Sequence, residues 1–163
     1  AHALDNNIVA MSHPDGMSSL LSGSVECQLT TSPYVYKEAA EEGIHEVEGL
    51  ESVWPDGNSF IVMMASTDLY EKNPELYQAV VSALEEAITW INENKEEAAE
   101  MLCEAEDVDA QTMLEWLNDP ACVYSTETKG VMDMAEFMSE NDFLENEGPS
   151  SMSDLAFDNV KGN

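Results

Sequence analysis

The feature that most constrains the fold is a repeated start and stop signal for short helices, set between short apolar runs. A polar residue precedes proline at Ser12-His13-Pro14, and Gly23 follows after the length of one short helix. Ser32-Pro33 and Gly43 repeat the pattern. Proline suits the first helical turn, and glycine suits the position just after the last one. The pattern therefore predicts two short helices between residues 12 and 43.

Short apolar or alternating runs flank these two helices. They cover residues 8–11, 25–29, 44–47 and 59–66, and they predict strands, with a turn at residues 54–58 before the last run. Strands that alternate with short helices are typical of parallel pairing with right-handed crossovers. The expected fold class is therefore α/β, with a βαβαβ arrangement over residues 8–66.

Beyond residue 66 the apolar residues recur at helical spacing instead. The expected helices begin at Asn73-Pro74, at Lys95, after Asp109, and after Ser125 or Thr126, and the third of them stops before Pro120. The second part of the chain, residues 67–163, is therefore expected to be helical. Acidic residues on these helices lie mostly off the apolar stripes, which indicates solvated faces rather than metal sites.

The charge balance excludes several classes of partner. The chain has 34 acidic residues against 5 lysines and no arginine, which gives a formal net charge of −29. Nucleic acid and anionic membrane surfaces are recognised by clusters of Lys and Arg, so neither is an expected partner. Apolar residues make up 44% of the chain, and this excludes the composition of a disordered protein. A length of 163 residues corresponds to about one domain.

The residues that usually carry catalysis do not form a recognisable pattern. Cys27, Cys103 and Cys122 lack metal-ligand spacing and have no basic neighbour that would activate a thiolate. The sequence also lacks a nucleophile elbow, a glycine-rich phosphate loop and a calcium loop. We therefore expect no catalytic residue, no metal site and no cofactor, and a protein that is not an enzyme. No apolar run approaches the ~20 residues of a membrane span.

Two polar segments at helix starts are the best candidates for a binding site. They are Ser12-His13-Pro14-Asp15 and Thr30-Thr31-Ser32-Pro33-Tyr34. In open α/β sheets ligands bind beyond the carboxyl ends of strands, where helix N-termini present free N–H groups. Ordinary helix capping explains the same residues equally well, so both interpretations remain open at this point.

The run HPDGMSSLLSGSVECQLTTSPYVYKE resembles the solute-binding proteins of ABC importers in the nitrate/sulfonate/taurine group. The resemblance continues through SFIVMMAST, NPELYQAVVSALEEAITWINENKEEAAEML, GVMDMAEFM and SSMSDLAF, in the order of that family. It implies a periplasmic-binding-protein-like fold of type II, in which two α/β lobes close on a small ligand. It also implies that this chain is the carboxy-terminal portion, with the family's N-terminal part absent. Residues 8–66 would form part of the second lobe with the hinge-crossing strand, and residues 67–163 the helical return to the first lobe.

The same resemblance implies function, site and location. The family captures a small ligand outside the cytoplasm and hands it to a membrane permease, as a periplasmic protein or one lipid-anchored at the outer face of the cell membrane. The residues implied to face the ligand are Thr30, Thr31, Ser32 and Tyr34, with His13 and Asp15. Ser32 stands where the family motif often has a first proline, which places an additional hydroxyl in this loop.

The ligand and two alternative functions remain open. Sulfonate or nitrate is well served by a guanidinium, and the chain has none, so such anions would rely on helix N-termini and hydroxyls. A thiamine-precursor pyrimidine is equally compatible. One alternative is a pyrimidine-synthesising enzyme of thiamine biosynthesis, which has the same fold but a cysteine-rich motif that is missing here. The other is a chain without binding activity of its own.

Overall fold

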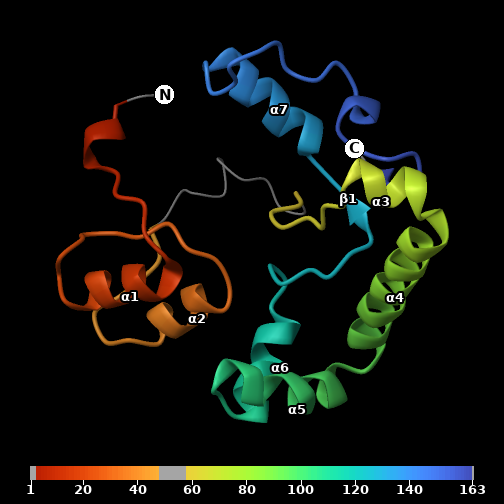
Figure 1. Cartoon of the computed structure of the whole chain (residues 1–163). Coiled ribbons are helices and arrows are strands. Elements are labelled where there is room, and N and C mark those ends of the chain that lie inside the picture. The colour runs from red at the N-terminus through yellow and green to blue at the C-terminus, as the bar shows by residue number, and fades with distance from the viewer. Residues whose placement is uncertain (1–2, 48–57, 163) are drawn as a thin grey trace. The chain divides into compact units, whose positions relative to one another are not determined.

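The computed structural model describes residues 3–47 and 58–162 of the chain, which divides into two compact units, Ala1–Leu50 and Glu51–Asn163 (Figure 1). Among the described residues no helix is long and apolar enough to cross a membrane. The turn predicted at residues 54–58 lies outside the described residues except for its last position. The assignment of residues 8–66 and 67–163 to parts of two lobes stays a prediction.

The first unit contains the two short helices that the start and stop signals predict. It consists of a 3₁₀ helix η1 (Asp5–Asn7), α1 (His13–Leu21) and α2 (Tyr34–Ala39). Ser12 caps α1, because its hydroxyl accepts a hydrogen bond from the Asp15 backbone N–H. Gly23 follows with a φ of +72°, the left-handed region that glycine reaches without strain. The prediction of α1 is therefore confirmed, whereas α2 ends at Ala39, earlier than the expected stop at Gly43.

The strands predicted over residues 8–11, 25–29 and 44–47 are wrong. Among residues 3–47 no ladder of backbone hydrogen bonds joins these segments, and their apolar side chains are largely exposed, with Leu29 at 89%. A strand is stable only when its N–H and C=O groups pair with a neighbour and its side chains are covered. The apolar pattern identified segments with β propensity. In the described part of this unit, however, no neighbouring strand pairs with them and their apolar side chains stay largely uncovered.

The second unit is mainly helical, as the sequence predicts. Its helices are α3 (Thr67–Lys72), α4 (Pro74–Glu93), α5 (Lys95–Glu106), α6 (Ala110–Asn118), α7 (Val131–Glu140) and the 3₁₀ helix η3 (Met152–Asp154). The predicted starts of α4, α5 and α6 are confirmed. Helix α3 is an addition that we did not predict, and it begins where the Ser66 hydroxyl accepts a hydrogen bond from the Leu69 N–H.

Two predictions in the second unit are wrong. Residues 59–66 form no strand in the described structure, and their side chains are exposed, with Met64 at 88%. The last long helix begins after Gly130 rather than after Ser125 or Thr126. The Ser125 hydroxyl instead accepts from the Glu127 N–H at 3.0 Å, and strand β1 (Glu127–Thr128) then pairs in parallel with β2 (Lys161–Gly162). These two-residue strands form the one sheet present among the described residues.

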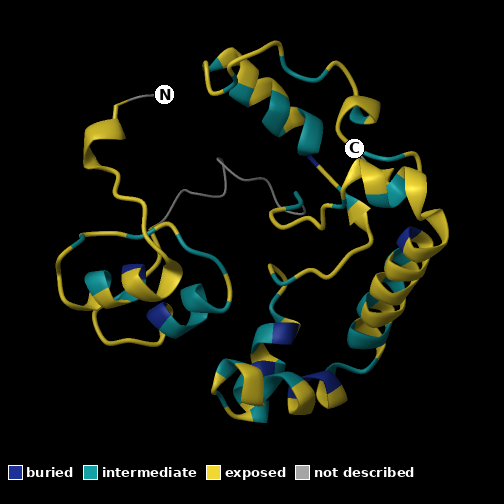
Figure 2. Cartoon of the chain, in the orientation of Figure 1, coloured by how far each residue is buried: buried dark blue, intermediate teal, exposed yellow. Residues whose placement is uncertain are grey.

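The core of the second unit lies between α5 and α6 (Figure 2). Its buried side chains are Ala98, Ala99, Met113 and Leu117, with Leu117 only 3% exposed. The small alanines allow α6 to approach α5 closely, and the larger Met113 and Leu117 fill the space between them. The Lys95 ammonium also donates to the carbonyl of Leu117 at 2.6 Å, which connects the start of α5 to the end of α6.

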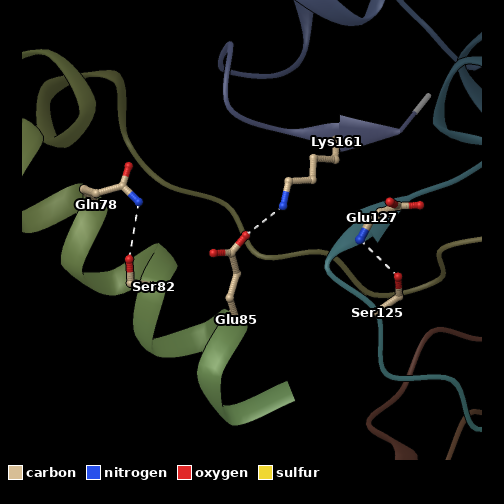
Figure 3. Close-up of polar contacts among 6 residues, drawn as sticks. All are labelled: Gln78, Ser82, Glu85, Ser125, Glu127 and Lys161. Carbon is tan, nitrogen blue, oxygen red and sulfur yellow. Dashed lines mark hydrogen bonds and ion pairs between the residues drawn. The ribbon is translucent and has the colours of Figure 1, made fainter. Parts of the chain in front are cut away.

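A second cluster connects the C-terminal segment to α3 and α4. The Tyr70 and Phe157 rings stack with centroids 4.2 Å apart, and both pack against Tyr77 edge to face. The Tyr77 hydroxyl donates to the Asn159 side-chain carbonyl at 2.8 Å. Figure 3 shows a further link, in which the Lys161 ammonium of β2 lies 3.2 Å from the carboxylate of Glu85 on α4. These contacts fix the tail of the chain against the two helices.

Candidate functional site

Three of the residues predicted to face a ligand meet where α1 and α2 begin. His13 Nδ1 lies 3.1 Å from the Thr30 hydroxyl, within hydrogen-bond distance, and the His13 and Tyr34 rings stack with centroids 5.6 Å apart. Both helices lie side by side in the first unit (Figure 1). Because His13 is the first residue of α1 and Tyr34 the first of α2, the pairing brings the two helix N-termini together. The two rings, the Thr30 hydroxyl and the two helix starts are therefore adjacent.

The other predicted residues lie at the same helix starts but do not join this contact. Asp15 accepts a hydrogen bond from the Ser12 hydroxyl at 2.6 Å, which engages its carboxylate in the cap of α1. The carbonyl of Thr31 accepts from the Val35 N–H at 3.1 Å, while within residues 3–47 the side chains of Thr31 and Ser32 form no hydrogen bond. For Asp15 the structure therefore shows a capping role.

The structure adds Glu38, a residue that the sequence reasoning missed. It lies one helical turn after Tyr34 and is 5% exposed, and it is the one buried acidic side chain among the described residues. Its Oε1 atom is covered and has no hydrogen-bond partner. Burial raises the pKa of this carboxyl, and the neighbouring charge of His13 lowers it by less. The sequence contained one signal for Glu38: it lies four residues after Tyr34, and residues four apart lie on the same face of a helix.

Gln28 is the second residue that sequence reasoning missed. Its Nε2 donates to the carbonyl of His13 at 3.4 Å, while its Oε1 is covered and has no hydrogen-bond partner. The amide packs directly on Gly16 of α1, where an added Cβ would come within 2.5 Å of it. Gly16 thus provides the room that brings Gln28 over α1. The site therefore contains two covered oxygen acceptors that lack donors.

These groups are suited to binding rather than to nucleophilic catalysis. A Thr–His pair becomes an activated nucleophile when a third group orients the base by a hydrogen bond. The charge of His13 lowers the pKa of Glu38, but the covered Oε1 atom of Glu38 makes no hydrogen bond to the ring. The Lys37 ammonium lies over the Tyr34 ring, 5.6 Å from its centroid, so a positive charge is also close to this site. The site therefore provides a ligand with aromatic surfaces for stacking, with hydroxyl groups and with hydrogen-bond acceptors.

The second unit contains a separate apolar hollow between α4 and α5. It has a volume of about 430 Å³ and is lined mainly by Trp90, Ile91, Ala98 and Leu102, with Met101 at its edge and 70% exposed. Glu86 of α4 is the one charged residue among those that line it. A ligand site usually combines an apolar wall with a few converging polar groups. This hollow lacks converging polar groups. The cluster of His13, Gln28, Thr30, Tyr34 and Glu38 around the starts of α1 and α2, called the α1/α2 site below, is therefore the better candidate.

Metal and thiol chemistry find no support in the described residues. No group of three or more His, Cys, Asp and Glu side chains lies close enough to hold a metal ion within the part of the chain that the structure describes. The three cysteines are free thiols. Burial and the charge of Asp119 raise the pKa of Cys122, which favours its protonated, unreactive form.

Comparison with known proteins identifies a family for this chain. The NMT1-like family matches residues 3–105, which is more than half of the chain and includes the whole α1/α2 site. No curated protein and no solved structure matches the chain. The family implies a periplasmic-binding-protein-like fold, and its solute-binding members are typically extracytoplasmic. Most members bind substrates without chemistry, although thiamine pyrimidine synthases also belong to it. The chain belongs to the NMT1-like family, the family of nitrate/sulfonate/taurine-type solute-binding proteins.

Proposed function

We propose that this protein serves as the extracytoplasmic solute-binding component of an ABC-type importer, periplasmic or lipid-anchored at the outer face of the cell membrane. It would capture a small organic ligand and deliver it to a membrane permease. The observation that carries the proposal is the meeting of His13, Thr30 and Tyr34 at two helix starts. This meeting lies within the range that matches the family, and family membership supports the role of the permease.

The proposed binding surface is centred on His13, Thr30 and Tyr34, with Thr31, Ser32 and Asp15 at the same edge. The rings of His13 and Tyr34 would add a flat surface on which an organic group can stack.

We further propose a periplasmic-binding-protein-like fold of type II, with residues 8–66 in the second lobe and residues 67–163 returning to the first. The exposure of the apolar segments 8–11 and 59–66 supports this proposal. Exposed apolar segments usually mark a surface that another surface covers, and two lobes that close on each other would provide one.

A thermal-shift screen of the 163-residue chain tests the function directly. Taurine, aliphatic sulfonates, nitrate and pyrimidines would be titrated, and at least one class is expected to raise Tm in a saturable way. A ligand at a concentration of about 100 Kd stabilises the native state by about 2.7 kcal/mol. Tyr34→Ala is expected to abolish the shift, because it removes the stacking surface next to His13.

Tyr124→Ala provides the matched control, since Tyr124 belongs to the second unit and should leave the shift unchanged. Circular dichroism would show that both variants keep the helical content of the parent chain. Flat titrations with every compound would overturn the proposed function. A shift that survives Tyr34→Ala and disappears with Tyr124→Ala would move the site away from α1 and α2.

A further inference from the structure

Helix α4 has an apolar face that the rest of the second unit leaves largely uncovered (Figure 2). Leu76, Val80 and Leu84 follow one another at a spacing of four, so they lie on the same face, and they are between 38% and 57% exposed. Tyr77 is the one buried residue among the 20 residues of this helix. A contiguous apolar stripe on the surface of a soluble protein usually marks an interface.

The same face continues into the apolar hollow between α4 and α5. Ala87 and Ile91 follow Leu84 at helical spacing, and both line the hollow. Met101 of α5 lies exposed at its edge, and a flexible methionine adapts to the shape of a partner. The continuous surface formed by Leu76, Val80, Leu84, Ala87 and Ile91 is called the α4 stripe below. It extends about 22 Å along the helix, the length of about 15 residues of a second helix.

Acidic side chains border the α4 stripe. A second hollow, of about 340 Å³, is lined by Glu86 and Glu93, and it shares Glu86 and Trp90 with the apolar hollow. Helices α4 and α5 carry nine acidic residues and one lysine, Lys95, whose ammonium donates to the carbonyl of Leu117. Within the described part of the chain neither Glu86 nor Glu93 forms an ion pair. The border of the stripe therefore carries negative charge that no neighbouring cation offsets.

We propose that the α4 stripe is a docking surface for a partner protein that presents a cationic amphipathic helix. The apolar side chains of such a helix, at positions i, i+3, i+4 and i+7, cover the stripe and enter the hollow. Its Lys and Arg side chains lie against Glu86 and Glu93, which gives the contact its charge complementarity.

Other occupants fit this surface less well. A second copy of the chain carries the same net charge of −29 and would bring its own acidic residues against the acidic border. A small polar ligand would find no converging polar groups in the hollow. The docking surface belongs to the second unit, whereas the α1/α2 site belongs to the first, so the proposed solute binding does not depend on it.

Three matched peptides test the docking. The probe is a labelled peptide of about 15 residues, made of leucine and lysine, with all leucines on one face of a helix. The first control has the same composition in an order that leaves no apolar face, and the second has glutamate in place of each lysine. Fluorescence anisotropy with the full chain in about 0.15 M KCl measures each Kd, since salt at this level screens diffuse attraction beyond about 8 Å. We expect the probe to bind at least about tenfold tighter than the first control and the second control not to bind.

A substitution inside the hollow locates the contact. Ala87 is exposed and lines the hollow, so Ala87→Trp fills the space and is expected to weaken binding of the probe at least about tenfold. Ala121→Trp is the matched control, because Ala121 is exposed after the end of α6 and does not line the hollow. Circular dichroism would show that both variants keep the helical content of the parent chain.

A second pair of variants tests the charge. Glu86→Gln with Glu93→Gln removes the acidic border and is expected to weaken binding about fivefold and to make Kd less dependent on salt. Glu136→Gln with Glu140→Gln removes the same charge from exposed positions of α7 and is expected to leave the Kd within about twofold of the parent value.

Several results would overturn the docking surface. Equal affinity for the probe and the first control would mean that only the net charge of the chain attracts the peptides. Undiminished binding in Ala87→Trp would place the contact elsewhere, and binding of the glutamate peptide would remove the requirement for a cationic partner. Sedimentation of the chain alone as a dimer that Ala87→Trp dissociates would show that a second copy is the occupant instead.

Discussion

Glu38 and Gln28 give the first unit an unusual residue pattern, in which the proposed ligand site coincides with a weak point in stability. A buried carboxylate oxygen without a donor destabilises the native state, since its charged form loses water and the attraction of His13 offsets only part of that loss. Binding sites often keep such groups although a neutral residue would be more stable. The charged groups near Glu38 are His13 on α1 and Lys37, its neighbour on α2.

The raised pKa of Glu38 predicts a pH dependence of stability. Burial raises the pKa of this carboxyl in the folded chain above its unfolded value, so the native state holds the proton more tightly. The stability that the neutral form provides is therefore complete below the unfolded pKa and is lost as pH rises through the folded pKa. We expect Glu38→Gln to raise Tm near pH 7 and to have little effect near pH ~4.

Thermal unfolding of Glu38→Gln and Glu41→Gln at both pH values measures this effect. Glu41→Gln should follow the parent chain throughout, because this side chain is exposed. A lower Tm for Glu38→Gln near neutral pH would contradict the account, since it would mean that the charged carboxylate stabilises the fold.

Among the elements of secondary structure, most helix starts could be predicted, but the strands could not. Helix starts depend on local chemistry, such as the Asp109 carboxylate that accepts from the Thr112 N–H at 2.9 Å and has its pKa lowered by this bond. Strands depend on partners that the local sequence does not contain. Residues 59–66 have the composition of a buried strand, yet among the described residues they find no partner strand.

The candidate site likewise contains residues that could be predicted from the sequence and residues that could not. The start of α1 could be located because Ser12 and Pro14 mark it, and Pro33 marks the start of α2 although no side chain caps that helix. The burial of Glu38 could not be predicted, because it depends on how α1 packs against α2. Gln28 could not be found either, since its position depends on the space above Gly16.

The core between α5 and α6 provides a test at this scale. Leu117→Ala is expected to lower the free energy of unfolding by about 2–4 kcal/mol, because it leaves a cavity between two close-packed helices. Met101→Ala, at an exposed position of α5, is expected to change it by less than about 0.5 kcal/mol. Urea unfolding followed by circular dichroism measures both, and equal losses for the two variants would show that this core does not hold the helices together.

At the scale of the whole molecule, charge is the dominant property. With 34 acidic residues and 5 lysines, the chain repels itself in every compact state. Ion pairs offset little of this repulsion, since exposed pairs such as Lys72–Asp68 contribute at most about 1 kcal/mol. The charge thus favours solubility and opposes compactness, and it leaves the choice of ligand to the local groups of the α1/α2 site.

Salt should therefore stabilise this protein. Raising KCl from about 0.1 M to about 1 M shortens the Debye length from about 10 Å to about 3 Å, which screens most of the repulsion. Tm is expected to rise steadily across this range, and differential scanning calorimetry measures it. A Tm that falls with added KCl would mean that attractive ion pairs outweigh the repulsion between acids.

We propose that a small ligand binds where α1 and α2 begin. The most direct test is a ¹H–¹⁵N NMR titration of the 163-residue chain with the compound that gives the largest thermal shift. We predict saturable shifts concentrated in the amides of residues 12–16 and 28–38. Shifts concentrated in α4 and α5 around Trp90, or no saturable shift in any amide, would contradict the claim.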